Sequence, residues 1–315
     1  MVQNLEIMQA AISEIFKRER GDVPLDIQPL HGGVVNAVFS VQLPDRNFVI
    51  RLKEDSLAVY RKEKWVMECA AVAGVKVPEV FAVGQSETLS YMIIEKIEGV
   101  PGSAYKGDPT PLLRELGRMA RIVNEIEVEG FGFHLEMQPT PHFTESWQDM
   151  MSWEKEFIFG TDTLLSIGAL NKQKFERAQR FLEPMQHWKF PPRLSHSDIS
   201  LENMMLSNEG VVYLIDWTQA KGSPAPYFDI GNFAGGAKNP LHIEAFLEGY
   251  GLDSVQYAKI KADADRVGFA SVLRAAVWAA GEKHAELPKF VADVHRVVER
   301  ILLPVTRVHV AGMQK

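Results

Sequence analysis

Three side chains with oxygen donors follow one another in the latter part of the chain. Asp198 is followed five residues later by Asn203, and Asp216 ends an apolar run that begins at Val211. Phosphoryl transfer requires a group that accepts the proton of the attacking hydroxyl, together with magnesium ions that neutralise the triphosphate. We therefore expect Asp198 to be the catalytic base, and Asn203 and Asp216 to bind the metal. An Asx turn followed by an acid at a strand end is the structural alternative.

The spacing of these residues suits their expected roles. A short rigid loop between Asp198 and Asn203 allows the base to face the acceptor while the amide turns back towards the nucleotide. The predicted strand before Asp216 places that carboxylate on a rigid element. His196, two residues before the base, is expected to be an internal strut of the loop.

The segments from His196 to Asn203 and from Ile215 to Trp217 resemble the catalytic and metal-binding motifs of the aminoglycoside phosphotransferase and choline kinase family, relatives of protein kinases. Ser197 stands where glycine is commonest in that family. A tryptophan directly after the aspartate, here Trp217, resembles the motif of small-molecule kinases rather than that of protein kinases. The run from Ile215 to Lys221 resembles the macrolide phosphotransferase branch. The resemblance implies an enzyme that uses ATP or GTP and Mg²⁺ to phosphorylate a hydroxyl of an antibiotic or a metabolite.

A kinase of this type must also hold a nucleotide, and the first hundred residues contain suitable groups. Arg51 lies on a predicted strand, where the family has a lysine or arginine that contacts the phosphates. Its planar guanidinium suits bidentate binding of phosphate. Glu63, on a predicted helix, matches the glutamate that pairs with this cation. Lys53 is the alternative cation, and both charges lying on the surface is the alternative interpretation.

Backbone groups are expected to complete the nucleotide site. Gly33 lies in a segment that resembles the family's nucleotide loop, where a missing side chain allows backbone amides to approach phosphate. Two glycines in an ordinary hairpin turn are the alternative. The run around Glu95 and Ile97 resembles the hinge of the family, so the carbonyl of Glu95 and the amide of Ile97 are expected to meet the adenine edge.

Periodicity predicts the elements that position these residues. The pattern predicts an α+β, two-lobed protein-kinase-like fold, with a small antiparallel sheet and helices in residues 1–97 and a larger, mostly helical lobe in residues 98–315. Strands are expected at 36–42, 47–52, 80–83, 90–96 and 211–215, and helices at 5–18, 56–74, 112–127, 147–157, 172–186 and 242–250, with two long helices after residue 253.

Composition narrows the class of protein. The chain has 315 residues, 46% of them hydrophobic, with 34 Lys and Arg against 41 Asp and Glu, a net charge of −7. This composition is typical of a globular chain and argues against binding to nucleic acid. The single cysteine, Cys69, forms no internal disulfide, and no apolar run is long enough for a membrane span. We expect a cytoplasmic protein without a membrane partner, and its oligomeric state stays open.

The acceptor is the least constrained part of the interpretation. An apolar stripe in the second lobe is expected to pack in the core, although a cradle for a cation or a macrolide is conceivable; it comprises Phe143, Trp147, Met150, Trp153 and Phe157. No acid follows Glu299, which argues against a polycationic aminoglycoside. A protein kinase and an inactive kinase fold that only binds nucleotide or ligand are the competing functions.

Overall fold

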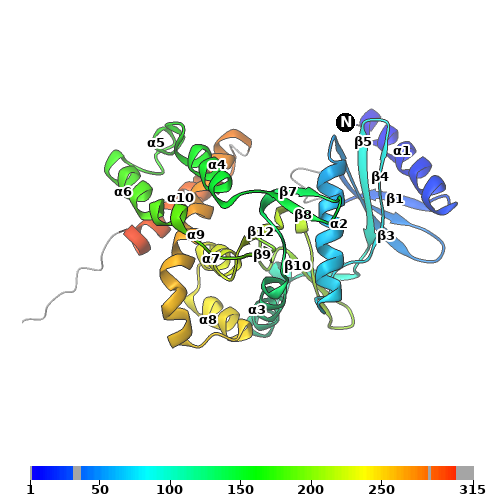
Figure 1. The fold of residues 1–315 in the computed structure, drawn as a ribbon. Coiled ribbons are helices and arrows are strands. Elements are labelled where there is room, and N and C mark those ends of the chain that lie inside the picture. The colour runs from blue at the N-terminus through cyan, green and yellow to red at the C-terminus, as the bar shows by residue number, and fades with distance from the viewer. Residues whose placement is uncertain (1, 31–36, 283–284, 303–315) are drawn as a thin grey trace, which may run out of the picture.

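The computed structural model describes residues 2–30, 37–282 and 285–302, and its N-terminal part is built on one antiparallel sheet. The five strands are ordered β1-β2-β3-β5-β4. Figure 1 shows α1 on one side of this sheet and α2 on the other. The elements are α1 (Val2–Arg20), β1 (Asp26–Pro29), β2 (Ala37–Gln42), β3 (Asn47–Glu54), α2 (Leu57–Val72), β4 (Val80–Ser86) and β5 (Leu89–Glu95).

The two faces of strand β3 have different surroundings, because successive side chains of a strand point to opposite faces. Phe48, Ile50 and Leu52 are buried in one cluster with apolar residues of α1. Arg51, which lies between them, points to the opposite face and meets α2. Lys53 is exposed, so Arg51 is the cation that the fold turns inward.

The C-terminal part is mostly helical and carries two small sheets, ordered β11-β10-β6 and β8-β7-β12-β9. Its helices are α3 (Thr110–Glu125), α4 (Trp147–Phe159), α5 (Thr163–Ser166), α6 (Lys172–Leu182), α7 (Tyr227–Gly236), α8 (Pro240–Tyr250), α9 (Ser254–Glu282) and α10 (Leu287–Leu302), with short 3-10 turns η1 (Gly102–Ala104), η2 (Glu183–His187) and η3 (Trp217–Gln219). Its strands are β6 (Gly99–Pro101), β7 (Phe131–Glu136), β8 (His142–Glu145), β9 (Pro192–Ser195), β10 (Met204–Ser207), β11 (Val212–Leu214) and β12 (Lys221–Pro224).

The order of elements confirms the α+β prediction and most of the long helices. The apolar stripe is partly wrong, because Phe143 lies on β8, while Trp147 and Met150 are buried on α4 and Trp153 is 49% exposed. The strands missed between residues 99 and 145 have three to six residues each, too few for a clear alternation of polar and apolar positions. Within the described residues we find no helix that is long and apolar enough to cross a bilayer.

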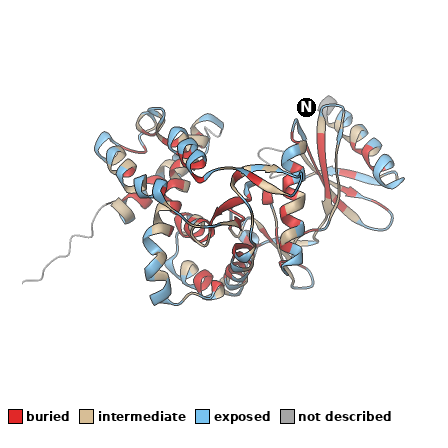
Figure 2. Ribbon diagram, in the orientation of Figure 1, coloured by how far each residue is buried: buried red, intermediate tan, exposed pale blue. Residues whose placement is uncertain are grey.

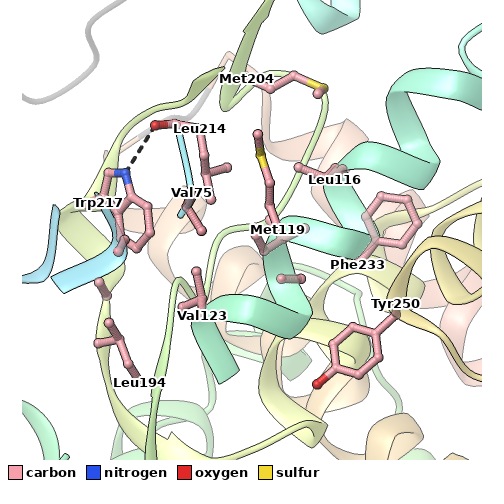
Figure 3. Close-up of a cluster of buried hydrophobic side chains, with 14 of the residues drawn as sticks. Val75, Leu116, Met119, Val123, Leu194, Met204, Leu214, Trp217, Phe233 and Tyr250 are labelled. Carbon is pink, nitrogen blue, oxygen red and sulfur yellow. Dashed lines mark hydrogen bonds between the residues drawn. The ribbon is translucent and has the colours of Figure 1, made fainter. Parts of the chain in front are cut away.

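One apolar cluster joins the two parts of the molecule. It contains residues of α2, of α3 and of the segment around Trp217, which is fully buried. The indole nitrogen of Trp217 donates a hydrogen bond of 3.1 Å to the carbonyl oxygen of Leu214, and Figure 3 shows both beside Val75. Figure 2 shows the buried residues continuing from the sheet through α2 into the helices. The residue after Asp216 is therefore anchored in the core.

Two glycines allow α3 and α8 to cross closely. A Cβ added at Gly117 would overlap the carbonyl oxygen of Phe246, and a Cβ at Gly249 would overlap that of Arg114. Because a glycine carries only a hydrogen atom in place of a side chain, the backbones of the two helices come into contact at these positions.

We expect Gly117→Ala to lower the free energy of unfolding by about 1–3 kcal/mol, because a contact between two backbones relaxes poorly when it is overpacked. Gly236→Ala on α7 is the control, since no atom lies within 4 Å of its added Cβ. The control should be neutral or slightly stabilising. Equal unfolding midpoints of the two variants in urea would contradict the crossing.

Candidate active site

The loop after β9 holds the predicted base and the predicted amide together. The side-chain nitrogen of Asn203 donates to the carboxylate of Asp198 at 2.7 Å and to its backbone carbonyl at 2.8 Å. Asn203 therefore uses its nitrogen within the loop, and its oxygen is the atom that can meet a metal.

A buried carboxylate fixes the start of this loop. Asp229, at the first turn of α7, accepts hydrogen bonds from the backbone nitrogens of His196 and Ser197, at 3.2 and 2.7 Å, and from the side chain of Asn124 at 2.6 Å. Burial raises the pKa of Asp229 to about 6, against the lowering effect of these donors. Asp229 therefore braces the backbone of the loop that leads to Asp198.

His196 is the internal strut that the sequence predicts. Its ring is fully buried, lies against Trp217, and places Nε2 3.1 Å from the carbonyl oxygen of Ile215. Nδ1 accepts from the backbone nitrogen of Asp198 at 3.3 Å. One neutral tautomer, with the proton on Nε2, satisfies both contacts. Burial lowers the pKa of His196 to about 4, so the ring is neutral near pH 7.

The predicted second metal ligand lies beside the first. The backbone nitrogen of Ile215 donates to the carbonyl oxygen of Asn203 at 2.9 Å, which brings the next residue, Asp216, next to the loop. Asp216 has a φ of 56°, a left-handed conformation that aspartate tolerates better than most residues. Its side chain is 50% exposed, so its carboxylate can be reached from solvent.

Arg51 and Glu63 form a buried ion pair on the other side of Asp216. A nitrogen of the Arg51 guanidinium donates to Glu63, whose side chain is 1% exposed. A second nitrogen donates to the hydroxyl of Thr218 at 2.9 Å and lies 3.9 Å from the Asp216 carboxylate. Burial opposes the charge of Arg51, but Glu63 and Asp216 outweigh it and raise its pKa.

Thr218 and Lys62 are two members of the site that sequence reasoning missed. The hydroxyl of Thr218 lies 2.7 Å from the Asp216 carboxylate, so it links that acid to Arg51. The Lys62 ammonium donates to the carbonyl oxygens of Thr218 and Ala220, at 2.6 and 2.8 Å, and thereby ties α2 to η3. Burial lowers the pKa of Lys62 to about 8. Its position next to Glu63 in the helix was the available signal.

The environment also tunes Asp198. Desolvation by the surrounding protein is the main effect and raises the pKa of its carboxyl group, although the side chain is accessible to solvent. Asn203 opposes this shift, and the negative charge of Asp216 adds to it. A carboxylate with a raised pKa is a better proton acceptor while it stays ionised.

The oxygen atoms of the site fit a metal ion that is bound jointly by the protein and by the phosphates of a nucleotide. Within residues 2–30, 37–282 and 285–302, no three His, Cys, Asp or Glu side chains form a metal cluster. Mg²⁺ commonly binds through one or two protein oxygens together with substrate phosphates and water. The carboxylate of Asp216 and the amide oxygen of Asn203 are donors of this type.

Three further residues are predicted to contribute to the nucleotide site. Gly33 lies outside the described residues. Glu95 is the last residue of β5, and Ile97 is half-buried in the connection to β6. Their main-chain contacts with adenine stay a prediction.

Comparisons with known proteins identify the family of this chain. Residues 26–262 match the model of the phosphotransferase enzyme family, and the chain belongs to that family. The hygromycin-B 4-O-kinase of Escherichia coli is 23% identical over 229 residues, which cover 70% of this chain and 65% of that protein. A probable ketoamine kinase of Enterococcus faecium is 22% identical over 231 residues, which cover 69% of this chain and 78% of that protein.

Solved structures show the same fold. A thermostable mutant of aminoglycoside phosphotransferase APH(4)-Ia, in its apo form, matches 91% of this chain and 98% of its own, with a TM-score of 0.72 at 16% identity. The same mutant in a ternary complex with ADP and hygromycin B matches 92% of this chain and 98% of its own, with a TM-score of 0.67 at 17% identity. The predicted two-lobed, kinase-like fold is confirmed.

Ser197 shows a local conflict that a glycine would remove. Its φ of 65° lies in the left-handed region, and its hydroxyl is buried without a hydrogen-bond partner. We expect Ser197→Gly to stabilise the protein by about 1 kcal/mol, because relief of strain and desolvation exceeds the added backbone entropy of the unfolded chain. The melting temperature should rise by about 2–4 °C.

Ser152→Gly on the exposed surface of α4 is the matched control. It should lower the melting temperature, since glycine destabilises a helix interior by about 0.5–1 kcal/mol. A loss of stability in Ser197→Gly of the same size would contradict the strain.

The neutral state of His196 makes stability depend on pH. Its pKa is about 4 in the folded protein and near 6.5 when unfolded, so its contribution is present above pH 6.5 and is lost as the pH falls towards 4. The stability difference between wild type and His196→Gln should therefore shrink by about 1.5 kcal/mol from pH 6.5 to pH 5. Urea unfolding at each pH measures this, and a constant difference would contradict burial of a neutral ring.

Proposed function

We propose that the protein transfers the γ-phosphate of ATP or GTP to a hydroxyl group of a small molecule, with Mg²⁺ as cofactor. One observation carries this proposal: Asp198, Asn203 and Asp216 converge beside the buried pair of Arg51 and Glu63. A base, two metal ligands and a phosphate-binding cation are the groups that phosphoryl transfer needs.

Asp198 is the proposed base. Its carboxylate is reachable from solvent and is held by Asn203, and its raised pKa favours uptake of a proton from the acceptor hydroxyl. The loop is fixed by Asp229 and His196, so little reorganisation is needed when the acceptor binds. Bound Mg²⁺ would neutralise the phosphates, with Asn203 and Asp216 as its protein ligands.

The nucleotide is proposed to bind to the lobe formed by residues 1–97, and the acceptor to the lobe formed by residues 98–315. Arg51 would contact the phosphates while Glu63 orients its guanidinium. Gly33 would lie over the phosphates, and the main chain at Glu95 and Ile97 would bind the base. The ADP bound in the related ternary complex supports a nucleotide site in this fold.

The acceptor is proposed to be a hydroxylated small molecule. The two relatives by sequence are named for a hygromycin and for ketoamines, so the family accepts different acceptors on one scaffold. An inactive binding protein is disfavoured because all three proposed catalytic and metal-binding residues are present, with Asn203 bonded to Asp198 and joined through Ile215 to the segment of Asp216.

Two substitutions separate the proposed roles. We expect Asp198→Asn to lower kcat by about 10²–10⁴-fold with little change in the binding of magnesium nucleotide, because only the proton acceptor is removed. Asp216→Ala should instead weaken the binding of magnesium nucleotide, because a metal ligand is lost. Phosphate-transfer assays give kcat, and thermal shift with magnesium ATP gives binding.

Asp162→Asn, an exposed change before α5, is the control and should behave as wild type in both assays. Equal turnover by wild type and Asp198→Asn would refute the role of the base. Unchanged nucleotide binding by Asp216→Ala would refute its role at the metal.

A further inference from the structure

Lys221 is a buried cation without an acceptor. The residue is 1% exposed, and among the residues described by the structure its ammonium has neither a hydrogen-bond acceptor nor a carboxylate at ion-pair distance. Its Nζ lies 4.4 Å from the ring centre of Phe133 and 4.7 Å from that of Phe228. Two aromatic faces thus hold the ammonium, but its three N–H donors stay unused.

The tip of this side chain can still be reached. Within the described part of the chain, the polar side-chain atoms that are sealed from solvent and also lack a partner are Ser197 Oγ and Asn232 Oδ1. The Lys221 Nζ is not one of them, although it has no partner. The ammonium therefore retains a small solvent-accessible area, within the 1% exposure of the residue.

Lys221 lies beside the proposed catalytic loop. It is paired with Ser195 across strands β12 and β9, three residues before Asp198. The ring of Phe228 that contacts it precedes Asp229, which fixes the same loop. Its aromatic neighbours belong to β7 and α7, in the part of the chain proposed to bind the acceptor.

The charged groups around Lys221 include two further cations and two carboxylates, and both carboxylates are engaged elsewhere. Arg274 on α9 acts electrostatically on both Lys221 and Asp198; Glu154 opposes its effect on Lys221, but is bonded to the Arg274 guanidinium at 2.5 Å. Lys62 is also near and is already bonded to backbone carbonyls. Asp229 is near too, but its carboxylate is occupied by the loop. Burial, followed by Arg274, lowers the pKa of Lys221 to about 7.

An unpaired buried ammonium is expensive, and a methionine would fill the same space between the rings without that penalty. A structural role alone does not account for a charged end that is left without an acceptor. A ligand with an oxyanion would satisfy the N–H donors of the ammonium. A polycationic acceptor would be repelled by Lys221 and Arg274.

We propose that Lys221 binds an oxyanion, a carboxylate or phosphate group, on the hydroxylated acceptor that Asp198 activates. This inference rests on the proposed function and narrows its substrate class to anionic hydroxy compounds. Lys221 is then a residue that determines acceptor specificity.

The first test measures binding without turnover. Sulfate is titrated at constant ionic strength into protein saturated with magnesium and a non-hydrolysable ATP analogue, and unfolding temperature is recorded. We expect saturable stabilisation of wild type, and an apparent Kd at least about tenfold weaker in Lys221→Met because its charge-assisted hydrogen bonds are lost. Lys155→Met, an exposed change on α4, is the control and should match wild type. Equal sulfate affinity of wild type and Lys221→Met would overturn the inference.

The second test measures selectivity with acceptor pairs that differ only in charge: gluconate and gluconamide, and glycerate and glyceramide. Wild type should favour the carboxylate in kcat/KM, Lys221→Met should lose that preference through KM, and the control Lys155→Met should keep it. Preference for the amide by wild type would overturn the inference.

Two further measurements keep these outcomes separate from other failures. If Lys221→Met fails to fold, Lys221→Gln replaces it, and Lys221→Arg should restore sulfate binding in part. Absence of any stabilisation of wild type by magnesium nucleotide would refute the proposed function. A normal nucleotide response with equal sulfate affinity in both proteins would refute the role of Lys221 alone.

Discussion

The buried ion pair between Arg51 and Glu63 is the constraint on which the site depends. Two charges removed from water are stabilised only when further hydrogen bonds satisfy them, and Thr218 supplies one to Arg51. The same threonine lies against Asp216, so the strand β3, the helix α2 and the segment around Asp216 are fixed by one set of polar contacts. Lys62 adds a second link from α2 to the backbone of that segment. Loss of one partner of such a pair costs about 3–5 kcal/mol.

The catalytic loop is held in a different way, by a carboxylate that binds backbone and by a neutral imidazole. Asp229 accepts from two consecutive backbone nitrogens, and His196 uses both ring nitrogens within the loop. The left-handed conformations at Ser197 and Asp216 flank the reacting region. Strain of this kind persists where the surrounding contacts over-determine the backbone, and here those contacts hold Ser197, next to Asp198, and Asp216.

The buried cations near these residues differ in how they are paired. Arg51 lies between the carboxylates of Glu63 and Asp216, and Arg274 is paired with Glu154. Among the described residues, Lys221 has no carboxylate at ion-pair distance and contacts two aromatic rings.

The sequence by itself determined the elements with long periodic patterns, such as α1, α2 and α9, and the spacing of Asp198, Asn203 and Asp216, because these depend on neighbours along the chain. Arg51 could be told from Lys53 only in the structure, because both lie on the same face of β3 and only Arg51 is buried against Glu63 of α2, while Lys53 is exposed. Thr218 and Lys221 carried no local signal, and the signal for Lys62 was limited to its position next to Glu63. The contacts that give these three residues a role join segments far apart in the chain, and only tertiary packing brings such segments together.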